Sequence, residues 1–170
     1  KNLVNEGEDA ISSLQGTPSG YLKVSVPMVF GQLHIAPLLS EFLIRFPNIK
    51  LSLSMDDKVV DLVQDGLDMV LRIGELSDSN LVARKLSRCR SVLCGSPSYF
   101  KKHGKPQELN DLKQHNCLYY SYYRSGLEWV FDGPNGSERI KPDGNIQVNN
   151  SDVLKLLMLD DIGLCQMPLF

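Results

Sequence analysis

The feature that most constrains this chain is a strand–helix–strand–helix–strand pattern that fills residues 20–76 and leaves little room for connections. Residues 21–26 (YLKVSV) alternate in polarity and are rich in β-branched side chains, which predicts a strand. Residues 49–55 (IKLSLSM) alternate in the same way and predict a second strand. A helix that Pro47 ends is expected between them, because apolar side chains recur at helical spacing at Leu33, Ala36, Leu39, Phe42, Leu43 and Phe46.

The rest of this pattern predicts one more helix and one more strand. Asp56 or Asp57 can cap a short apolar helix that Gly66 closes, and residues 68–73 (DMVLRI) form the third strand. Two consecutive helical crossovers indicate a parallel sheet, because parallel strands cannot be joined by a tight turn. Open parallel sheets bind ligands beyond the carboxyl ends of their strands, where the strand order reverses. The pattern therefore predicts an α/β fold and the place of a ligand site.

Composition excludes several classes of protein. The chain has 170 residues, of which 42% are hydrophobic, enough for one large core or two small ones. Its 18 Lys and Arg residues nearly balance 20 Asp and Glu residues, and no basic run exceeds two residues, so the charge pattern of a nucleic-acid-binding surface is missing. No apolar stretch approaches the roughly 18 residues of a membrane span, and residues 1–14 lack the apolar centre of a signal peptide. A cytoplasmic location is expected.

The four cysteines are interpreted as structural or incidental thiols of a reducing compartment, with redox sensing as the alternative. They form no CxxC pair and no Cys/His metal spacing, and they are Cys89, Cys94, Cys117 and Cys165. Cys89 and Cys94 would point to opposite faces of one strand, because their positions differ in parity. No metal or other cofactor is expected.

The flanking segments extend this plan. Residues 2–15 look like the end of a helix with a heptad-like spacing, and residues 16–20 look like a linker. In the second half, strands are expected at residues 81–86, 90–96, 117–123 and 162–168, and helices after Ser96, near Pro106 and from Asn150 or Ser151 to Leu159. Residues 127–148 predict antiparallel hairpins with a tight turn at Asn135-Gly136. Two lobes with a cleft between them are the simplest arrangement.

Nine short motifs, in order from Gly20 to the end of the chain, resemble the effector-binding, substrate-binding-like domain of LysR-type transcriptional regulators. The motifs are GYLKVSVP, APLLSEFLIRFP, DLVQDGLDMVLRIGEL, LVARKL, LCGSPSY, HNCL, WVFDGP, VNNSD and IGLCQMP. Each motif alone is weak, but together they cover nearly the whole chain.

The resemblance implies two Rossmann-like lobes of the type 2 periplasmic-binding-protein kind, with a small effector in the cleft. Residues 1–19 would be the end of a linker helix and a linker, 20–80 lobe I, 81–168 lobe II, and 169–170 the start of a return to lobe I. The chain would be a fragment that lacks the amino-terminal winged helix-turn-helix and the last strand and helix of lobe I.

In lobe I, the resemblance places the effector beside the loop after the first strand, residues 27–31 (PMVFG), where Met28, Val29, Phe30 and Gly31 are the candidate contacts. Many LysR regulators have Ser or Thr in this loop, so the apolar side chains here suggest a more apolar effector, or one that only backbone amides bind. Gly31 would free the backbone so that amides at the start of the next helix can face an anion. Alternatively, Val29 and Phe30 simply fill the interior of the lobe.

Arg72 ends the third strand among apolar neighbours, where a charge is costly unless it is paired. Its guanidinium could clamp an acidic effector with two parallel hydrogen bonds. It could instead pair with Asp56, Asp57 or Glu75 and hold the hinge. Both interpretations remain open from the sequence.

In lobe II, four candidate effector contacts are expected, namely Ser96, Tyr120, Asn149 and Asn150. Ser96 is interpreted first as a helix cap, although the resemblance turns that cap towards the cleft. Tyr120 is the candidate among the tyrosines near the crossing point, where some side chains line the pocket and others belong to the core. Asn149 and Asn150 lie at a strand-to-helix turn, where an amide side chain can cap the helix or bind a ligand.

The resulting prediction is a ligand-sensing domain of a transcriptional regulator, with an anionic or aromatic effector. Homodimers are expected through outer helices such as residues 33–46, and the full-length protein could also form tetramers. DNA would be bound only by the missing amino-terminal domain. No membrane contact is expected. The alternative is a periplasmic-type solute-binding protein, which would need a signal peptide. An enzyme is not expected, because no GxSxG motif, phosphate loop, HExxH motif or carboxylate pair with a base is visible.

Overall fold

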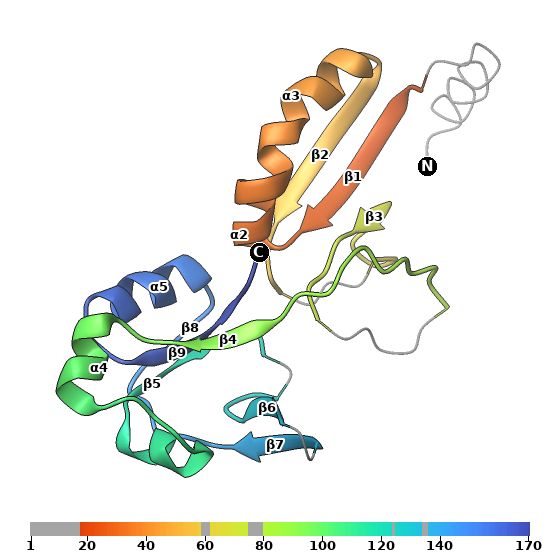
Figure 1. Ribbon diagram of the computed structural model, residues 1–170. Coiled ribbons are helices and arrows are strands. Elements are labelled where there is room, and N and C mark those ends of the chain that lie inside the picture. Colours follow the sequence, from red (N-terminus) through yellow and green to blue (C-terminus); the bar gives the residue numbers. More distant parts are fainter. Residues whose placement is uncertain (1–17, 59–61, 75–79, 124, 134–135) are drawn as a thin grey trace. The chain divides into compact units, whose positions relative to one another are not determined.

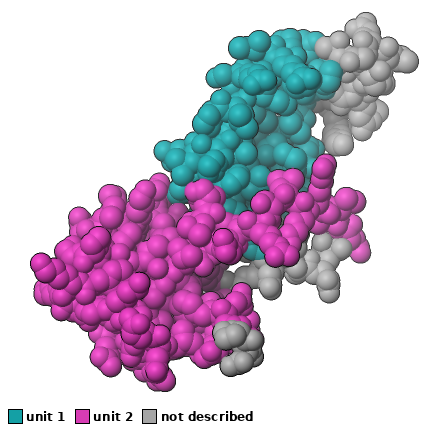
Figure 2. Space-filling model, in the orientation of Figure 1, with its two compact units in different colours: residues 1–74 teal, residues 75–170 magenta. Residues whose placement is uncertain are grey.

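The computed structural model describes residues 18–58, 62–74, 80–123, 125–133 and 136–170. The chain divides into two compact units, unit 1 (Lys1–Gly74) and unit 2 (Glu75–Phe170), which have separate colours in Figure 2. The helix expected at residues 2–15 lies outside the described residues. The predicted limits at residues 19, 80 and 168 stay predictions.

Unit 1 contains the predicted parallel sheet. Strand β1 (Gly20–Val26) lies between β2 (Ile49–Met55) and β3 (Met69–Val70), and both pairings are parallel (Figure 1). The third strand is shorter than the predicted residues 68–73, because regular pairing with β1 covers only two of its residues. The α/β fold and the order of the first elements are confirmed.

The first predicted helix is confirmed, with one irregularity. It begins as α2 (Met28–Phe30), widens into a π-helical turn (Gly31–Ile35) and continues as α3 (Ala36–Arg45) alongside β1 and β2 (Figure 1). Of the apolar residues at helical spacing, Leu33 and Leu43 are exposed, whereas Leu39 and Phe42 are partly buried. The π-turn changes the angular spacing of the residues on either side of it, which a strict 3.6-residue pattern does not anticipate.

The second predicted helix is not present as a helix in the described part of this segment. Residues 59–61 lie outside the described residues, and residues 62–66 form turns. Gly66 does end them as predicted: its φ is +61°, its amide donates to Val63 O at 3.2 Å, and the Leu67 amide donates to Leu62 O at 2.9 Å. This bond pair has the form of a helix C-cap motif that requires a left-handed residue.

Unit 2 is built on a mixed four-stranded sheet. Its order is β4 (Ser91–Cys94), β9 (Leu164–Pro168), β5 (Cys117–Tyr120) and β8 (Gln147–Val148), with β4 antiparallel and the others parallel. The helices of this unit are α4 (Pro97–His103), a 3₁₀ helix (Leu109–Gln114) and α5 (Ser151–Leu159). These helices start where the sequence predicts them, at Ser96-Pro97, near Pro106 and at Asn150.

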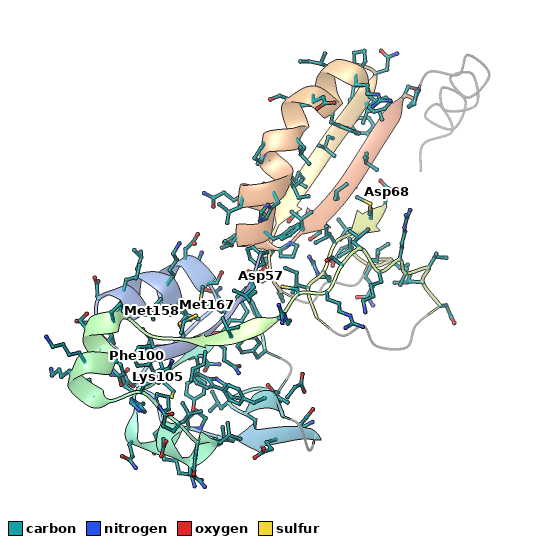
Figure 3. All side chains as sticks on the ribbon, viewed as in Figure 1. Asp57, Asp68, Phe100, Lys105, Met158 and Met167 are labelled. Atoms are coloured by element: carbon teal, nitrogen blue, oxygen red, sulfur yellow. The ribbon has the colours of Figure 1, made fainter. Side chains whose placement is uncertain are left out.

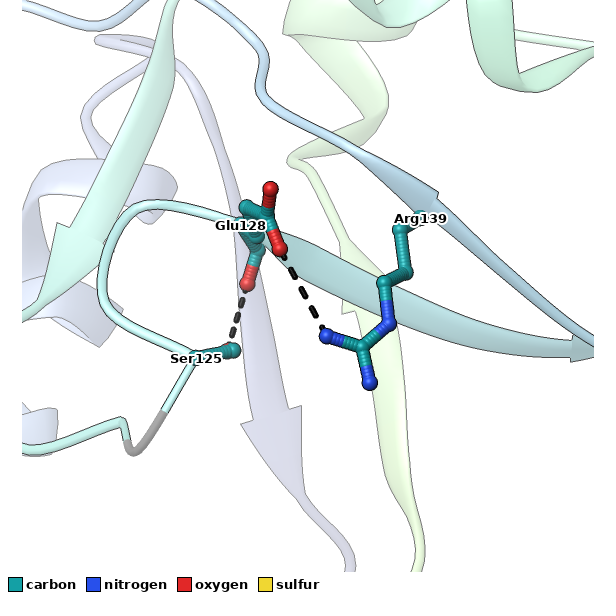
Figure 4. A network of polar contacts seen from close by, with 3 residues as sticks. All are labelled: Ser125, Glu128 and Arg139. Carbon is teal, nitrogen blue, oxygen red and sulfur yellow. Dashed lines mark hydrogen bonds and ion pairs between the residues drawn. The ribbon is translucent and has the colours of Figure 1, made fainter.

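Two strand predictions for unit 2 are corrected. Residues 81–86 are exposed and have no regular structure, because no strand among the described residues pairs with them. Only residues 129–140 of the predicted hairpin region form a hairpin, from β6 (Trp129–Gly133) and β7 (Gly136–Ile140), whereas β8 joins β5 in the main sheet. Figure 4 shows the start of the hairpin, where Arg139 lies 3.6 Å from the Glu128 carboxylate and Ser125 Oγ donates to Glu128 O at 2.6 Å.

The core of unit 2 has two clusters, one on each face of the sheet. Alternate residues of β5 and β9 enter opposite clusters, because successive strand residues point to opposite faces. The first cluster consists of Tyr99, Leu112, Cys117, Tyr119, Trp129, Ile140 and Leu164. The second consists of Leu118, Leu154, Met158 and Cys165, with Met167 packed against it (Met158 and Met167 are labelled in Figure 3).

Candidate functional site

The candidate site of unit 1 lies at the carboxyl edge of its sheet. Strands β1, β2 and β3 are parallel, so the residues that follow Val26, Met55 and Val70 meet at one edge. The chain continues from β1 to β2 on one side and to β3 on the other, so the strand order reverses around β1. The predicted location of the site therefore has a structural counterpart in unit 1.

The Arg72 side chain lies at this edge and connects the segment after β3 to β1. Its Nη2 donates to Ser25 Oγ at 2.9 Å and to Lys58 O at 3.4 Å, and its Nη1 donates to Leu71 O at 3.0 Å. Burial lowers the pKa of the half-buried guanidinium, and the negative charges of Asp57 and Asp56 oppose that shift. The acceptors that the described residues supply are neutral oxygens, so the guanidinium brings a positive charge to the edge, which the nearby charges of Asp57 and Asp56 offset only in part.

The two neighbouring carboxylates are directed to backbone amides. Asp57 Oδ1 accepts from the Met28 amide at 3.0 Å, and Asp56 Oδ1 accepts from the Lys58 amide at 2.8 Å (Asp57 is labelled in Figure 3). Among the described residues, neither carboxylate forms an ion pair with Arg72. Asp56 and Asp57 therefore act on Arg72 through their charges without contacting it, and Glu75, the third partner considered, lies outside the described residues.

The loop after β1 is mostly helix. Pro27 occupies the N-cap position and has no side-chain acceptor, so Asp57 supplies the acceptor for the Met28 amide from another segment. Val29 is buried, which favours the interpretation that it fills the unit, and the Phe30 ring lies 4.9 Å from the His34 ring.

Gly31 has a different role from the one expected. Its φ is −58° and its amide donates to Pro27 O at 2.7 Å, so it neither frees the backbone nor presents its amide to an anion. A Cβ at this position would lie 2.5 Å from Val26 Cγ2 and 3.4 Å from Met55 Sδ. Glycine fits here because the helix approaches the sheet closely, and a larger residue would require Val26 to move.

Aromatic side chains gather at the carboxyl end of β5 in unit 2. The Tyr120 ring makes edge contacts with the rings of Tyr122 and Tyr123, at centroid distances of 5.9 and 5.3 Å. Asn149 Nδ2 donates to Tyr122 Oη at 3.5 Å, and the Ser121 amide donates to Val148 O at 2.8 Å. The structure thus brings two predicted residues, Tyr120 and Asn149, to the same edge.

Ser96 and Asn150 both cap helices. Ser96 is buried, its Oγ accepts from the Tyr99 amide at 2.9 Å, and its hydroxyl also contacts the Asp161 carboxylate. The hydrogen bonds from the Ser96 and Ser98 hydroxyls lower the pKa of Asp161. Asn150 Oδ1 accepts from the amides of Asp152 and Val153 at 2.9 and 3.2 Å. These bonds support the capping interpretation of both residues.

Ser25 is the site residue that the sequence predictions missed. It is 1% exposed and lies between two buried valines, Val24 and Val26. The available signal was a hydroxyl at the second-last position of a strand that otherwise ends in apolar residues, close to the predicted carboxyl edge. Without the position of Arg72, this signal does not identify its partner.

A separate cavity of about 520 Å³ lies in unit 2, away from every predicted site residue. Apolar side chains line much of it, together with two carboxylates, and the main contributors are Leu93, Leu109, Leu112, Phe131, Glu108 and Glu138. The Glu108 side chain already accepts from a backbone amide of the 3₁₀ helix in a capping box. Glu108 therefore already has a partner within the 3₁₀ helix.

The thiols do not form a ligand set. Burial raises the pKa of Cys117 and of Cys165 to about 12 and raises that of Cys94, whereas Cys89 is exposed. Cys94 and Cys165 are opposite each other in the β4–β9 register and both belong to the second core cluster. In the part of the chain that the structure describes, no group of three or more His, Cys, Asp or Glu residues could hold a metal ion, and no helix is long and apolar enough to cross a membrane.

Comparison with known proteins gives consistent matches. Residues 15–170 match the family model of the LysR substrate binding domain. An uncharacterized HTH-type transcriptional regulator of Haemophilus influenzae is 33% identical over 98% of this chain and 58% of its own length. The HTH-type transcriptional activator TtdR of Escherichia coli K12 is 27% identical over 92% of this chain and 51% of its own length.

A solved structure agrees with these matches. The regulatory domain of CrgA, a LysR-type transcriptional regulator from Neisseria meningitidis, is 32% identical, with a TM-score of 0.73 over 89% of this chain and 74% of that chain. The chain spans about half the length of the curated relatives that it matches. These relatives are named as transcriptional regulators, which favours the regulator prediction over a periplasmic-type solute-binding protein.

Proposed function

Because the chain belongs to the LysR substrate binding domain family, we propose that it senses a small anionic effector at Arg72 and passes the bound state to a DNA-binding domain of the full-length protein. An effector can act in this way when it binds one of two conformations more tightly than the other, and a coupling of about 1–3 kcal/mol is typical. The DNA-binding part would be the winged helix-turn-helix that the family resemblance implies.

One observation carries the choice of an anion. The half-buried Arg72 guanidinium is held by Ser25 Oγ, Lys58 O and Leu71 O, all of them neutral. Among the described residues no carboxylate forms an ion pair with Arg72, and a partly buried cation of this kind is costly unless an anion completes it. The planar guanidinium can bind a carboxylate with two parallel hydrogen bonds.

The amide at the start of α2 is less suited to the same anion. Asp57 accepts from the Met28 amide, so a negative charge from the chain itself already occupies this helix end. Met28, Val29, Phe30 and Gly31 therefore contribute apolar surface and close packing to the proposed site, while Arg72 contributes the charge. This division refines the expectation of an effector held only by backbone amides.

Unit 2 supplies the remaining candidate contacts. Tyr120 and Asn149 are proposed as contacts for uncharged or aromatic groups, because aromatic edges and an amide side chain gather at that edge. Ser96 and Asn150 are proposed to support that edge as helix caps rather than to touch an effector directly.

Homodimer formation is proposed through the outer face of residues 33–46. Several large apolar side chains are exposed there, at Leu33, Leu38, Leu43 and Ile44. An exposed apolar stripe of this kind is typical of a protein–protein interface. DNA contact is proposed for a DNA-binding domain of the full-length protein, and a cytoplasmic location is proposed with it; neither catalysis nor a cofactor is part of the proposal.

A thermal-shift experiment on the 170-residue chain tests the anion proposal. Sodium benzoate is compared with benzamide, an uncharged molecule of nearly the same shape, in the wild type, Arg72→Gln and Arg45→Gln. Benzoate is expected to raise Tm more than benzamide in the wild type and in Arg45→Gln, because a bound ligand stabilises the folded state. The difference is expected to disappear in Arg72→Gln.

Two outcomes would contradict the proposal. A benzoate shift that is equal in the wild type and Arg72→Gln would make Arg72 a structural residue. The absence of any preference for benzoate over benzamide in the wild type, confirmed by calorimetry, would remove the anion from the proposal.

A further inference from the structure

We infer that Ser25 is the positioning residue of the proposed anion site, because its hydroxyl fixes the Arg72 guanidinium across the boundary between β1 and β3. This inference rests on the proposed function, since it assigns Ser25 a role in anion preference. Ser25 acts through Arg72 and need not touch the effector itself.

The first step concerns burial. Ser25 is 1% exposed and its neighbours Val24 and Val26 are buried as well, so its hydroxyl is out of reach of bulk water. A buried hydroxyl needs a hydrogen-bond partner, and the only one among the described residues is Arg72 Nη2 at 2.9 Å. The polar side chain at this strand position is thus explained by Arg72.

The second step concerns direction. The Ser25 carbonyl accepts from the Leu71 amide at 2.8 Å, while its Oγ accepts from the Arg72 guanidinium. The carbonyl and the hydroxyl of Ser25 therefore bind Leu71 and Arg72, two consecutive residues after β3. Leu71 O and Lys58 O then accept the other guanidinium bonds, at 3.0 and 3.4 Å.

The third step concerns what this fixation does for binding. A long arginine side chain loses much rotamer freedom when it binds a ligand, and a guanidinium already held in place loses less. Among the guanidinium bonds to described residues, the one to Ser25 is the shortest and the only one accepted by a side chain. Removal of the Ser25 hydroxyl should therefore free the arginine without removing its charge.

The strand next to β1 offers a matched control. Ser54 lies opposite Ser25 in the parallel β1–β2 register, but it is exposed and makes no side-chain hydrogen bond to any described residue. Ser54→Ala removes the same hydroxyl from a neighbouring strand position. Ser25→Thr keeps an acceptor oxygen at position 25 and tests rescue.

The experiment measures both the arginine and the binding preference in the 170-residue chain. Nitrogen-15 NMR of the arginine side chains measures how freely the Arg72 guanidinium rotates, and in the wild type without ligand this rotation is expected to be restricted. Ser25→Ala is expected to abolish this restriction and to lower the ratio of benzoate to benzamide affinity about tenfold, because the freed arginine then loses its rotamer freedom on binding the anion. Ser54→Ala should change neither, and Ser25→Thr should restore much of both.

The outcomes separate this inference from the proposed function. If Ser25→Ala leaves the Arg72 signals and the affinity ratio unchanged while Arg72→Gln abolishes the benzoate preference, the positioning role is wrong and the anion site stands. Should Ser25→Ala weaken benzoate and benzamide equally, Ser25 serves only the stability of unit 1. Should Arg72→Gln have no effect, the proposed function itself is wrong, and the NMR result still decides whether Ser25 restrains Arg72.

Discussion

The two units of this chain are built differently around similar α/β layouts. Unit 2 has two core clusters that include fully buried Leu118, Leu154 and Leu164, whereas the described part of α3 in unit 1 has no buried residue. At the carboxyl edges of the sheets, unit 1 presents Arg72 beside two carboxylates, and unit 2 presents tyrosines with Asn149. Among the described residues, unit 2 therefore has the larger packed core, whereas unit 1 buries Val24, Val26 and Val29 and leaves apolar side chains of α3 exposed.

The largest expected effect tests the contrast between the cores. Leu154→Ala in unit 2 should lower the free energy of unfolding by about 2–5 kcal/mol, because the side chain is 1% exposed and its removal leaves a cavity. Leu43→Ala in unit 1 should cost less than about 1 kcal/mol, since Leu43 is 43% exposed. Urea unfolding of both variants measures the difference. Equal losses would mean that α3 is packed as tightly as α5.

A smaller effect tests how each unit tolerates added volume. In Gly95→Ala the new methyl would lie 2.5 Å from Leu164 Cδ2 and 2.7 Å from Phe100 Cζ, which should cost about 1–3 kcal/mol. In Gly31→Ala the methyl meets Val26 Cγ2 at 2.5 Å, but alanine favours the helix by about 1 kcal/mol, so the net loss should be smaller. Thermal unfolding compares the two. A larger loss for Gly31→Ala would show that unit 1 is the less adaptable of the two.

The smallest effect concerns acid and the core of unit 2. His115 is 7% exposed, and burial, together with the charge of His103, lowers its pKa, against the opposing effect of Asp111. The unfolded chain then binds a proton more readily than the folded one, so stability should fall as pH drops below the ordinary histidine value of 6.5. His115→Gln should reduce the loss of Tm between pH 7.5 and 5.5, and His34→Gln, at an exposed position of unit 1, should not. An unchanged pH dependence in His115→Gln would contradict this assignment.

Local patterns predicted most elements of both units. The alternation in YLKVSV and IKLSLSM was sufficient for two paired strands, and Ser96-Pro97 and Asn150 marked helix starts that the structure confirms. The failures occur where long-range contacts decide. Residues 81–86 have a strand-like sequence but no pairing partner among the described residues, and β8 leaves the hairpin region because β5 offers it a parallel partner.

The candidate site was predictable only in part. The sequence led to Arg72 through its charge and to Tyr120 and Asn149 through their places at strand ends. It could not find Ser25, because the partner of its hydroxyl lies 47 residues away along the chain. It also misjudged Gly31, whose backbone is ordinary and whose missing side chain matters only because Val26 is close.

The sequence by itself determined the α/β class, the parallel βαβ order of unit 1 and the edge at which a ligand site belongs, because hydrophobic periodicity and capping residues act within a few residues along the chain. Only the tertiary structure decided which groups meet at that edge. There, Asp57 accepts from the Met28 amide and Ser25 holds Arg72, so the charge available to an anion is the guanidinium rather than the helix end. Such contacts depend on strand register and burial, which no local pattern contains.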